Sequence, residues 1–542
     1  MAFRIHHRRR LIVIFLILLI FYLLRREFYE RPAPVRRLGL QTSDNCPDYS
    51  VYSKRTHEPL SEGKLHLPFM RPDKQCRTFE SSAVESVIMD LKLRIADPDL
   101  FWLFQNAFPN TLDTTIWWYK PSDEDTDTPR TFVATGDIAA EWLRDSARQL
   151  SVYMPFIRHD EQLRNLVKGA IVQQALYIHT GPYCNAFQPP EESGLQRVPS
   201  AVDTVGPTPN WSEVFECKWE IDSLASFLTL TNEYIQFSGD NSILTLRLWI
   251  SAFKNILYVL SRQSTSTFDP HNGRLEAPYY IFQRETRLGT ETLPLYGRGN
   301  PVNSGTGLVR SAFRPSDDSC IFQFFIPGNA QMATELEKLA PVLADVGLDA
   351  YSVRSEDLGS RIREGIMKHG VVESGKYGKV FAYEVDGFAS FNMMDDANIP
   401  SLLSLPDLGF ISSTDPTYQN TRKMVLSRDN PYYLKGSYFE GIGGPHIGLA
   451  NAWPMSLLVQ IRTSDDDIEI ARLLELVKGS TCGLGLMHES VQVNSPSRRF
   501  TRSWFSWCNS EFAKTILDLA QRKPHLIFKD EYRDKPYEFK GL

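Results

Sequence analysis

The chain has 542 residues, of which 42% are hydrophobic and 23% are charged. This composition allows a large buried core and excludes wholesale disorder. The formal net charge is -6, and no long basic run occurs beyond the N-terminus, so we expect no nucleic acid partner.

The N-terminus carries the first predicted element, an apolar run over residues 11–24 with arginines on both sides. As a helix this run would span roughly 21 Å, less than the roughly 30 Å hydrocarbon core of a bilayer. A cleaved signal peptide is the alternative, but no small-x-small cleavage site follows the run. The flanking arginines can extend to the lipid headgroups. We therefore expect an uncleaved signal anchor over residues 11–24.

With this anchor, residues 1–10 form a cytoplasmic tail and the rest of the chain lies in the lumen of the secretory pathway, in the Golgi or endoplasmic reticulum. We therefore expect a single-pass type II membrane protein, although the basic residues on the two sides of the run are nearly balanced. The sequon Asn210-Trp211-Ser212 agrees with a lumenal chain and makes Asn210 a candidate N-glycan site.

Residues 25–75 are expected to form a stem and lead-in, and residues 76–542 one folded domain. The seven cysteines contain no CxxC pair, which argues against a zinc ribbon or a thioredoxin-like site. Cys46 and Cys76 flank the start of the folded region and are predicted to form a disulfide. The other five are at least as well explained as small buried apolar residues, and the odd number leaves at least one thiol.

Helical periodicity recurs from about residue 80. Ser82 to Glu85 has the spacing of a capping box, and Asp240 is placed to cap the helix that follows it. The segments between the helices are long and rich in Gly, Pro and aromatic residues, with short strands expected near 279–282 and 379–383. The predicted helices are 80–97, 98–108, 138–158, 160–178, 220–238, 241–262, 328–346, 354–369, 395–404, 446–463, 467–479 and 508–522.

A dozen helices with long connections favour a mainly α fold, an (α/α)6 barrel or toroid with short β-hairpins in its loops. The chain shows no 34- or 40-residue repeat, which argues against a helical repeat array. It also lacks a Rossmann glycine fingerprint, a Walker loop, a His-Glu-x-x-His motif and a Gly-x-Ser-x-Gly motif. These absences remove several enzyme classes.

Acidic and aromatic residues gather in several runs. In the first run, Asp137, Glu141 and Asp145 would share one face of a helix, with Arg144 beside them. Carboxylates and a guanidinium suit sugar hydroxyls, and a solvated acidic helix face is the plainer interpretation. The second run, residues 183–187, contains Asn185 and Phe187 and by itself indicates only a packed loop.

Asp222 follows two tryptophans in the run 211–223, where desolvation would raise a carboxyl pKa toward that of a general acid. Capping of the next helix is an equally good interpretation. Glu489 lies in Met487-His488-Glu489-Ser490, ahead of a tryptophan-rich segment, and is a candidate general base. Paired carboxyls from distant segments are what glycoside hydrolysis requires.

Three further runs are polar turns. Arg314, Asp317 and Asp318 surround a Pro-Ser turn that suits a polyhydroxylated ligand, calcium, or internal ion pairs. Asp395 and Asp396 stand at a predicted helix start, where capping is the more probable role. His446 ends a glycine-rich turn, where a structural role is favoured. One histidine among scattered acids does not make a zinc site, so we expect no metal and no cofactor.

Five of these motifs together resemble glycoside hydrolase family 125, in order from about residue 75 to 525, and look most like its fungal, membrane-anchored branch. They are Trp142-Leu143-Arg144-Asp145-Ser146, Phe313-Arg314-Pro315-Ser316-Asp317-Asp318, Met394-Asp395-Asp396-Ala397-Asn398, His488-Glu489-Ser490 and Trp504-Phe505-Ser506-Trp507. The resemblance implies a single (α/α)6 barrel and a metal-independent exo-α-mannosidase that removes terminal α-1,6-linked mannose from glycans with inversion.

By the same resemblance, Asp222 is the general acid and Glu489 the general base, with their carboxyls roughly 6.5–9.5 Å apart. The chain departs from the family pattern at Arg310, where Trp is expected, and at Ala312, Cys184 and Cys508. The residues expected to hold the sugar are Asp137, Trp142, Arg144, Asp145, Asn185, Phe187, Arg314, Asp317, Asp318, His446 and Trp504.

Two alternatives stay open at this point. The toroid also hosts other sugar enzymes, such as glucosidases, epimerases and lyases. A non-catalytic, membrane-held mannose-binding protein would use the same cleft without turnover.

Overall fold

The computed structural model describes residues 46–122, 128–200, 202–495 and 499–541. The chain divides into two compact units, residues 1–38 and 39–542, and all described residues belong to the second. The anchor predicted over residues 11–24 therefore lies outside the described residues. Among the helices that are described, none is long and apolar enough to cross a bilayer.

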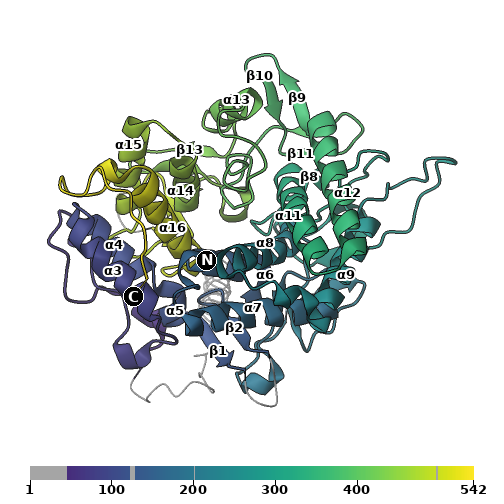
Figure 1. The fold of residues 1–542 in the computed structure, drawn as a ribbon. Coiled ribbons are helices and arrows are strands. Elements are labelled where there is room, and N and C mark those ends of the chain that lie inside the picture. Colours follow the sequence, from purple (N-terminus) through teal and green to yellow (C-terminus); the bar gives the residue numbers. More distant parts are fainter. Residues whose placement is uncertain (1–45, 123–127, 201, 496–498, 542) are drawn as a thin grey trace, which may run out of the picture. The chain divides into compact units, whose positions relative to one another are not determined.

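The second unit is built from two layers of helices (Figure 1). In the inner layer α16 packs on α6, α6 on α8, and α8 on α11, while α14 packs on α16. The inner helices are α6 (Leu143–Ser151), α8 (Ile221–Ser238), α11 (Ile326–Asp345), α14 (Pro454–Arg462) and α16 (Ser506–Arg522). The outer helices are α4 (Pro98–Ala107), α7 (Glu161–Thr180), α9 (Arg247–Gln263), α12 (Asp349–Gly365), α13 (Pro416–Val425) and α15 (Asp467–Gly479).

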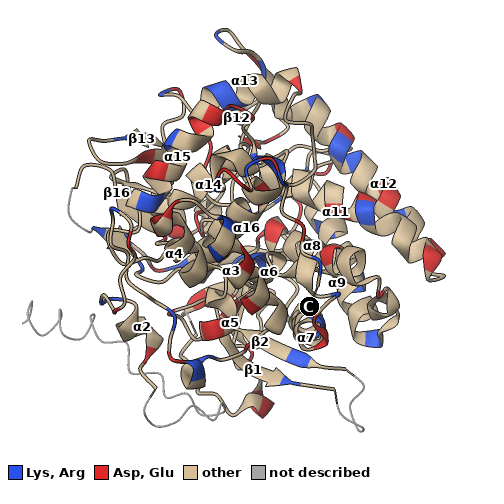
Figure 2. Cartoon of the chain, turned by 60° about the vertical axis from the view of Figure 1, so that its left-hand side comes forward, with Lys and Arg blue, Asp and Glu red and all other residues tan. Residues whose placement is uncertain are grey.

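The sequence of each layer reflects its burial. Outer helix α12 carries acidic and basic residues along its length, whereas inner helix α8 is almost free of charge (Figure 2). Nearly every residue in the first half of α8 is buried, including the carboxyl-bearing Asp222. A helix that is apolar all round belongs in the interior, as the inner layer requires.

Most predicted helices are confirmed to within a few residues, and α15 begins and ends where 467–479 was predicted. Two cap predictions need correction. The N-cap of α3 (Ser82–Arg94) is Ser81, whose hydroxyl accepts the Val84 amide. Asp240 accepts the Ser242 amide at the start of a short 3-10 helix, and α9 begins only at Arg247.

Three helix predictions are wrong in extent. The segment 138–158 is helical only over α6, because Glu141 and Trp142 form strand β3. Asp137, Glu141 and Asp145 therefore do not share a helix face. The segment 446–463 becomes helical only at Pro454, because the preceding glycine-rich turn takes other conformations, including a left-handed Gly448. The helix predicted at 354–369 starts earlier and ends in a π turn, Ile366–Gly370.

The helix predicted at 395–404 does not form. Pro400 and Pro406 cannot donate backbone hydrogen bonds. The Asp395 carboxylate instead accepts the Leu402 and Leu403 amides at 2.8 and 2.9 Å, which folds the segment into turns. These turns occupy the place of an inner helix ahead of α13, whose start is signalled by the N-cap Asp415 before Pro416 and was missed.

A buried ion-pair network ties this segment to the inner helices. Asp407 accepts hydrogen bonds from Arg462 of α14 at 3.0 Å and from Arg148 of α6 at 3.5 Å. Glu511 of α16 bridges the same two arginines at 2.6 and 2.7 Å. Four positions of the inner layer are thus joined by one set of charges.

Short antiparallel ribbons hold the loops at the N-terminal ends of the inner helices. Three of them have three strands, in the orders β3-β4-β6, β12-β11-β8 and β15-β16-β17. Their strands are β3 (Glu141–Trp142), β4 (Ala186–Phe187), β6 (Val214–Glu216), β8 (Phe324–Phe325), β11 (Glu384–Val385), β12 (Phe391–Asn392), β15 (Asn451–Ala452), β16 (Ser490–Gln492) and β17 (Phe500–Thr501).

The other four ribbons have two strands each. The strand expected near 379–383 is confirmed as β10, in a hairpin with β9, whereas the one expected near 279–282 is β7, which pairs with the distant β5. The pairs are β1 (Ile116–Lys120) with β2 (Arg130–Val133), β5 (Asp203–Gly206) with β7 (Ile281–Arg284), β9 (Val371–Ser374) with β10 (Gly378–Phe381), and β13 (Tyr433–Lys435) with β14 (Glu440–Ile442).

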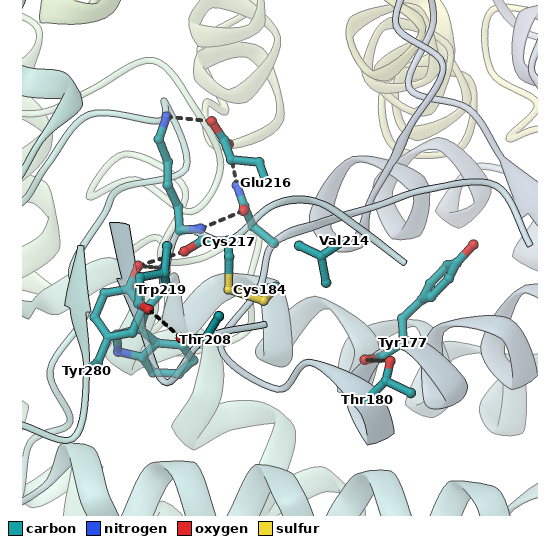
Figure 3. Close-up of a disulfide and its surroundings, with 12 residues drawn as sticks. Tyr177, Thr180, Cys184, Thr208, Val214, Glu216, Cys217, Trp219 and Tyr280 are labelled. Carbon is teal, nitrogen blue, oxygen red and sulfur yellow. Dashed lines mark hydrogen bonds and ion pairs between the residues drawn. A yellow bond between two sulfur atoms is a disulfide. The ribbon is translucent and has the colours of Figure 1, made fainter. Parts of the chain in front are cut away.

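Two disulfides are present. The predicted Cys46–Cys76 bond is confirmed, and it lies in the lead-in, where Tyr49 of α2 (Tyr49–Tyr52) packs on Trp504. The second bond joins Cys184 to Cys217 (Figure 3). It was not predicted, because Cys184 and Cys217 were read as buried apolar residues.

Candidate active site

A cavity of about 390 Å³ lies where the N-terminal ends of α6, α14 and α16 approach residues 315–317, Asn398, His446 and Glu489, the last of which precedes β16. It is lined by Thr135, Ile138, Trp142, Arg144, Asp145, Pro315, Ser316, Asp317, Asn398, His446, Trp453, Glu489, Arg502, Phe505 and Trp507. Six of the residues expected at the site are in this lining: Trp142, Arg144, Asp145, Asp317, His446 and Glu489.

One wall is organised around Arg144, at the start of α6. Its Nη1 donates to Glu220 Oε2 at 2.6 Å and to Asp222 Oδ2 at 3.0 Å. Its Nη2 lies 3.3 Å from Asp145 Oδ2. All four side chains are buried, and Asp222 lies directly behind Arg144 as seen from the cavity lining.

Burial raises the pKa values of both Glu220 and Asp222, against the opposing effect of Arg144. The two carboxyls share one guanidinium nitrogen of Arg144. Glu220 is served by three donors, Arg144, Asn185 and Ser223. Asp222 Oδ1 has no hydrogen-bond partner within the described residues. Arg144, which holds the other carboxyl oxygen, connects Asp222 to the cavity lining.

The opposite wall carries Glu489, which precedes strand β16. The ribbon β15-β16-β17 pairs Ser490 with Thr501, so Arg502 is brought beside Glu489. Arg502 Nε donates to Glu489 Oε1 at 3.2 Å, and its Nη1 contacts Asp137. His488 is buried in the same segment, with Nδ1 3.1 Å from the Arg502 carbonyl, and fixes the two strands together.

Asp317 stands between these walls. Burial favours its neutral form, but the charges of Lys218, Arg144, His446 and Arg502 outweigh that effect and hold the pKa of Asp317 below its ordinary value. Asp317 and Arg502 both have left-handed backbone conformations, with φ of 66° and 49°. Strained non-glycine residues of this kind concentrate at functional sites.

The cavity is lined by polar atoms that the protein itself leaves without partners. Within the described residues, no hydrogen bond satisfies the buried Asn398 Oδ1, Trp453 Nε1 or Trp507 Nε1. A buried polar atom without a partner costs free energy unless a ligand or water supplies one. Acceptors and indole donors spread over aromatic walls suit a ligand that carries several hydroxyl groups.

The other expected residues lie outside this lining. Asp137 contacts Arg502, and Asp318 is buried beside Ser316, where burial and Asp396 raise its pKa to about 6. Arg314 donates to Glu384 at 2.6 Å and faces an adjacent cavity of about 730 Å³.

The last three expected residues serve the surroundings of the cavity. Asn185 is fully buried and binds protein atoms only within the described chain. Phe187 is stacked on Tyr177, and Trp504 donates its indole N–H to Asn110.

Several lining residues were not proposed from the sequence, namely Asn398, Trp453, Arg502, Phe505 and Trp507. Each lies inside or next to a run that drew attention. Arg502 was missed because its partners lie 13 and 365 positions away in the sequence. Only the ribbon pairing brings these charges together.

Two separated carboxyls, cations and aromatic walls at the mouth of a helical double layer define a glycoside hydrolase site. The family model described as metal-independent alpha-mannosidase (GH125) matches residues 97–517. The chain belongs to glycoside hydrolase family 125 and is an α-mannosidase. Of the three interpretations that the sequence left open, the hydrolase is confirmed.

Two relatives illustrate the relationship. The meiotically up-regulated gene 157 protein of Schizosaccharomyces pombe (strain 972 / ATCC 24843) is 53% identical over 487 residues, which cover 90% of this chain and 94% of the relative. A metal-independent alpha-mannosidase from Streptococcus pneumoniae, solved in a non-productive complex with alpha-1,6-mannobiose, is 32% identical with a TM-score of 0.72. That match covers 81% of this chain and 99% of the bacterial one.

Proposed function

We propose that the chain is an inverting, exo-acting α-mannosidase that removes terminal α-1,6-linked mannose from glycans. One observation carries this proposal: two separate ribbons bring Glu489 and Arg144, which is hydrogen-bonded to the buried Asp222, to the same cavity. The linkage is supported by the α-1,6-mannobiose bound to the bacterial relative.

In this mechanism a water molecule attacks the anomeric carbon and gives its proton to Glu489. Asp222 delivers its proton to the glycosidic oxygen as the bond from that oxygen to the anomeric carbon breaks. Arg502 donates a hydrogen bond to Glu489 Oε1 and so orients the carboxyl that takes this proton. Burial raises the pKa of Asp222 and so favours the protonated form that a general acid requires. An inverting enzyme needs the two carboxyls roughly 6.5–9.5 Å apart, and this separation stays a prediction.

A linkage panel tests the substrate assignment. The purified protein is incubated with α-1,2-, α-1,3- and α-1,6-mannobiose and with an α-1,6-glucobiose, with and without EDTA. We expect free mannose mainly from the α-1,6-mannobiose, at an unchanged rate with EDTA. Faster cleavage of either other mannobiose would contradict the linkage, and release of glucose alone would contradict the sugar.

Variants of the two carboxyls test the roles. Asp222→Asn and Glu489→Gln should each lower the turnover of α-1,6-mannobiose by roughly 10²–10⁴-fold, the usual contribution of general acid–base catalysis. Circular dichroism checks that both variants fold. Near-normal turnover by either one would remove that residue from its proposed role.

We also propose that residues 11–24 anchor the chain as a type II membrane protein with the catalytic unit in the secretory lumen. The disulfides Cys46–Cys76 and Cys184–Cys217 support an oxidising compartment. Asn210 is exposed and is therefore accessible to a glycan. In microsomes, the catalytic unit should resist added protease, and Asn210→Gln should remove an endoglycosidase-sensitive mass. Digestion in intact microsomes would contradict this orientation.

A further inference from the structure

The Cys184–Cys217 disulfide lies at the base of the wall that carries the general acid. Each cysteine directly precedes a segment that turns toward that wall: Asn185 follows Cys184, and residues 218–222 follow Cys217. Both cysteines are buried. The bond therefore fixes two chain segments at the point where they diverge toward Glu220 and Asp222.

Tyr280 locks the Cys217 side of this arrangement. Its hydroxyl donates to the Cys217 carbonyl at 2.8 Å and accepts the Trp219 amide at 3.0 Å (Figure 3). The Trp219 indole donates to the Arg310 carbonyl at 2.9 Å. The backbone between Cys217 and Glu220 thus has little freedom to move on its own.

Asn185 provides the connection on the Cys184 side. Its Oδ1 accepts the Lys218 amide at 2.9 Å. Its Nδ2 donates to Glu216 Oε2 at 3.0 Å and to Glu220 Oε1 at 3.4 Å. The side chain is fully buried, and its hydrogen bonds go to protein atoms. Its contacts therefore indicate that it supports the wall that carries Asp222.

Glu220 connects Asn185 to the carboxyl of Asp222 through Arg144. Its Oε2 accepts Arg144 Nη1 at 2.6 Å, and the same nitrogen lies 3.0 Å from Asp222 Oδ2. A shift of Asn185 therefore moves Glu220, then Arg144, and finally the carboxyl of Asp222. A misplacement of about 1 Å in such a group can lower the rate by about 10²-fold.

We propose that the Cys184–Cys217 disulfide and Asn185 together position the general acid, acting on Asp222 through Glu220 and Arg144. This inference rests on the proposed function, because it takes Asp222 as the proton donor. It assigns Asn185 a positioning role in place of the sugar contact expected from the sequence.

Substrates with different leaving groups separate positioning from general stability. α-1,6-Mannobiose needs a proton on its leaving oxygen, whereas 2,4-dinitrophenyl α-mannoside departs without one. The double variant Cys184→Ala/Cys217→Ala should lower kcat for the mannobiose by about 10–100-fold and leave kcat for the aryl mannoside within about 2-fold.

The chain offers a matched control in its other disulfide. The sequence separations are 30 for Cys46–Cys76 and 33 for Cys184–Cys217, so loop closure contributes nearly equally to stability in the two cases. Cys46→Ala/Cys76→Ala should lower the Tm by a similar amount without changing the ratio of the two kcat values. An equal loss on both substrates, or the same ratio as in this control, would overturn the proposal.

Asn185→Ala provides a second test, because it removes the contacts with Lys218, Glu216 and Glu220 without placing a new carboxylate beside the two glutamates. It should show the same selective loss on the mannobiose, and it decides the matter alone if the double cysteine variant does not fold. Asp222→Asn is measured in parallel. If Asp222→Asn keeps its mannobiose turnover, the acid assignment fails; if only the disulfide and Asn185 variants keep theirs, the positioning proposal alone fails.

Discussion

Arg502 Nε lies 3.2 Å from Glu489 Oε1, and the same guanidinium contacts Asp137 across the ribbon. The backbone of Arg502 is left-handed, with φ of 49°, a conformation that costs an ordinary side chain roughly 1–3 kcal/mol. The fold thus accepts local strain where it places a cation beside the proposed base. The strained backbone of Arg502 thus accompanies the contact of its side chain with the proposed base, Glu489.

Replacing Arg502 with a residue that tolerates a left-handed backbone tests the backbone strain and the catalytic role of the side chain separately. Arg502→Asn should lower kcat for α-1,6-mannobiose by roughly 10²-fold, because Glu489 loses the hydrogen bond that holds its carboxyl in place. Asparagine tolerates left-handed backbone, so the Tm should stay the same or rise. Asp137→Asn, which removes only the outer partner of Arg502, should cause a smaller loss. Full activity in Arg502→Asn would contradict the role of this cation.

The general acid predicts a pH effect. Burial raises the pKa of Asp222, so the proton is retained to higher pH and activity is lost as pH rises through that pKa. The kcat/KM profile for α-1,6-mannobiose should therefore fall on its basic side. The profile for 2,4-dinitrophenyl α-mannoside should lack that fall, because this leaving group needs no acid. Identical basic limbs for the two substrates would argue against Asp222 as donor.

We predict that Asp145 lowers the stability of the protein at neutral pH but supports its activity. Burial, only partly offset by Arg144, raises its pKa from 3.8 to about 6. The folded state therefore holds an extra proton between about pH 4 and pH 6, and stability falls as pH rises through that window. At pH 7 the ionised form costs about 2–3 kcal/mol.

Asparagine mimics the neutral form of Asp145. Asp145→Asn should therefore raise the Tm at pH 7 but not at pH 4, while turnover of α-1,6-mannobiose drops. Thermal unfolding at the two pH values, with kinetics at pH 7, measures both effects. Destabilisation at pH 7 would show that the ionised carboxylate supports the fold instead.

The network around Asp407 predicts a loss of stability without a loss of chemistry. Burial alone would raise the pKa of Asp407, but Arg462, Lys514 and Arg148 hold it well below its ordinary value. Asp407→Asn leaves two buried arginines short of a partner and should cost roughly 3–5 kcal/mol in unfolding free energy. The effect should shrink as the pH falls below about 4, where the carboxylate is protonated in the unfolded chain.

The kinetics of Asp407→Asn serve as its control. At temperatures where this variant is folded, kcat should match that of the unchanged protein, because Asp407 lies at the far end of α14 from the cavity. An unchanged Tm would show that Glu511 alone satisfies the arginines. A large loss of kcat in the folded variant would show that the network shapes the site.

The helices of this fold were largely predictable because apolar periodicity and caps are local signals. The prediction at 395–404 failed where Pro400 breaks the pattern and Asp395 bonds to amides seven and eight positions ahead. The start of α14 was misplaced because a glycine-rich turn precedes Pro454. In both cases, contacts of the turn override the helical pattern of the side chains.

The site was predictable as a set of runs but less so as a set of contacts. Trp142, Arg144 and Glu489 lie where polar and aromatic residues gather in the sequence. Trp504 and Phe187 belong to the same runs yet pack behind the cavity. Which member of a run faces the ligand depends on ribbon register, and a shift of one residue reverses the face of a strand.

The central claim is inversion by an acid and a base on opposite walls of one cavity. The most direct measurement is ¹H NMR of the purified protein acting on α-1,6-mannobiose, read during the first turnovers before the anomers equilibrate. The account predicts that β-mannose appears first. Initial release of α-mannose would contradict it, because retention requires a carboxylate that attacks the sugar and forms a covalent intermediate.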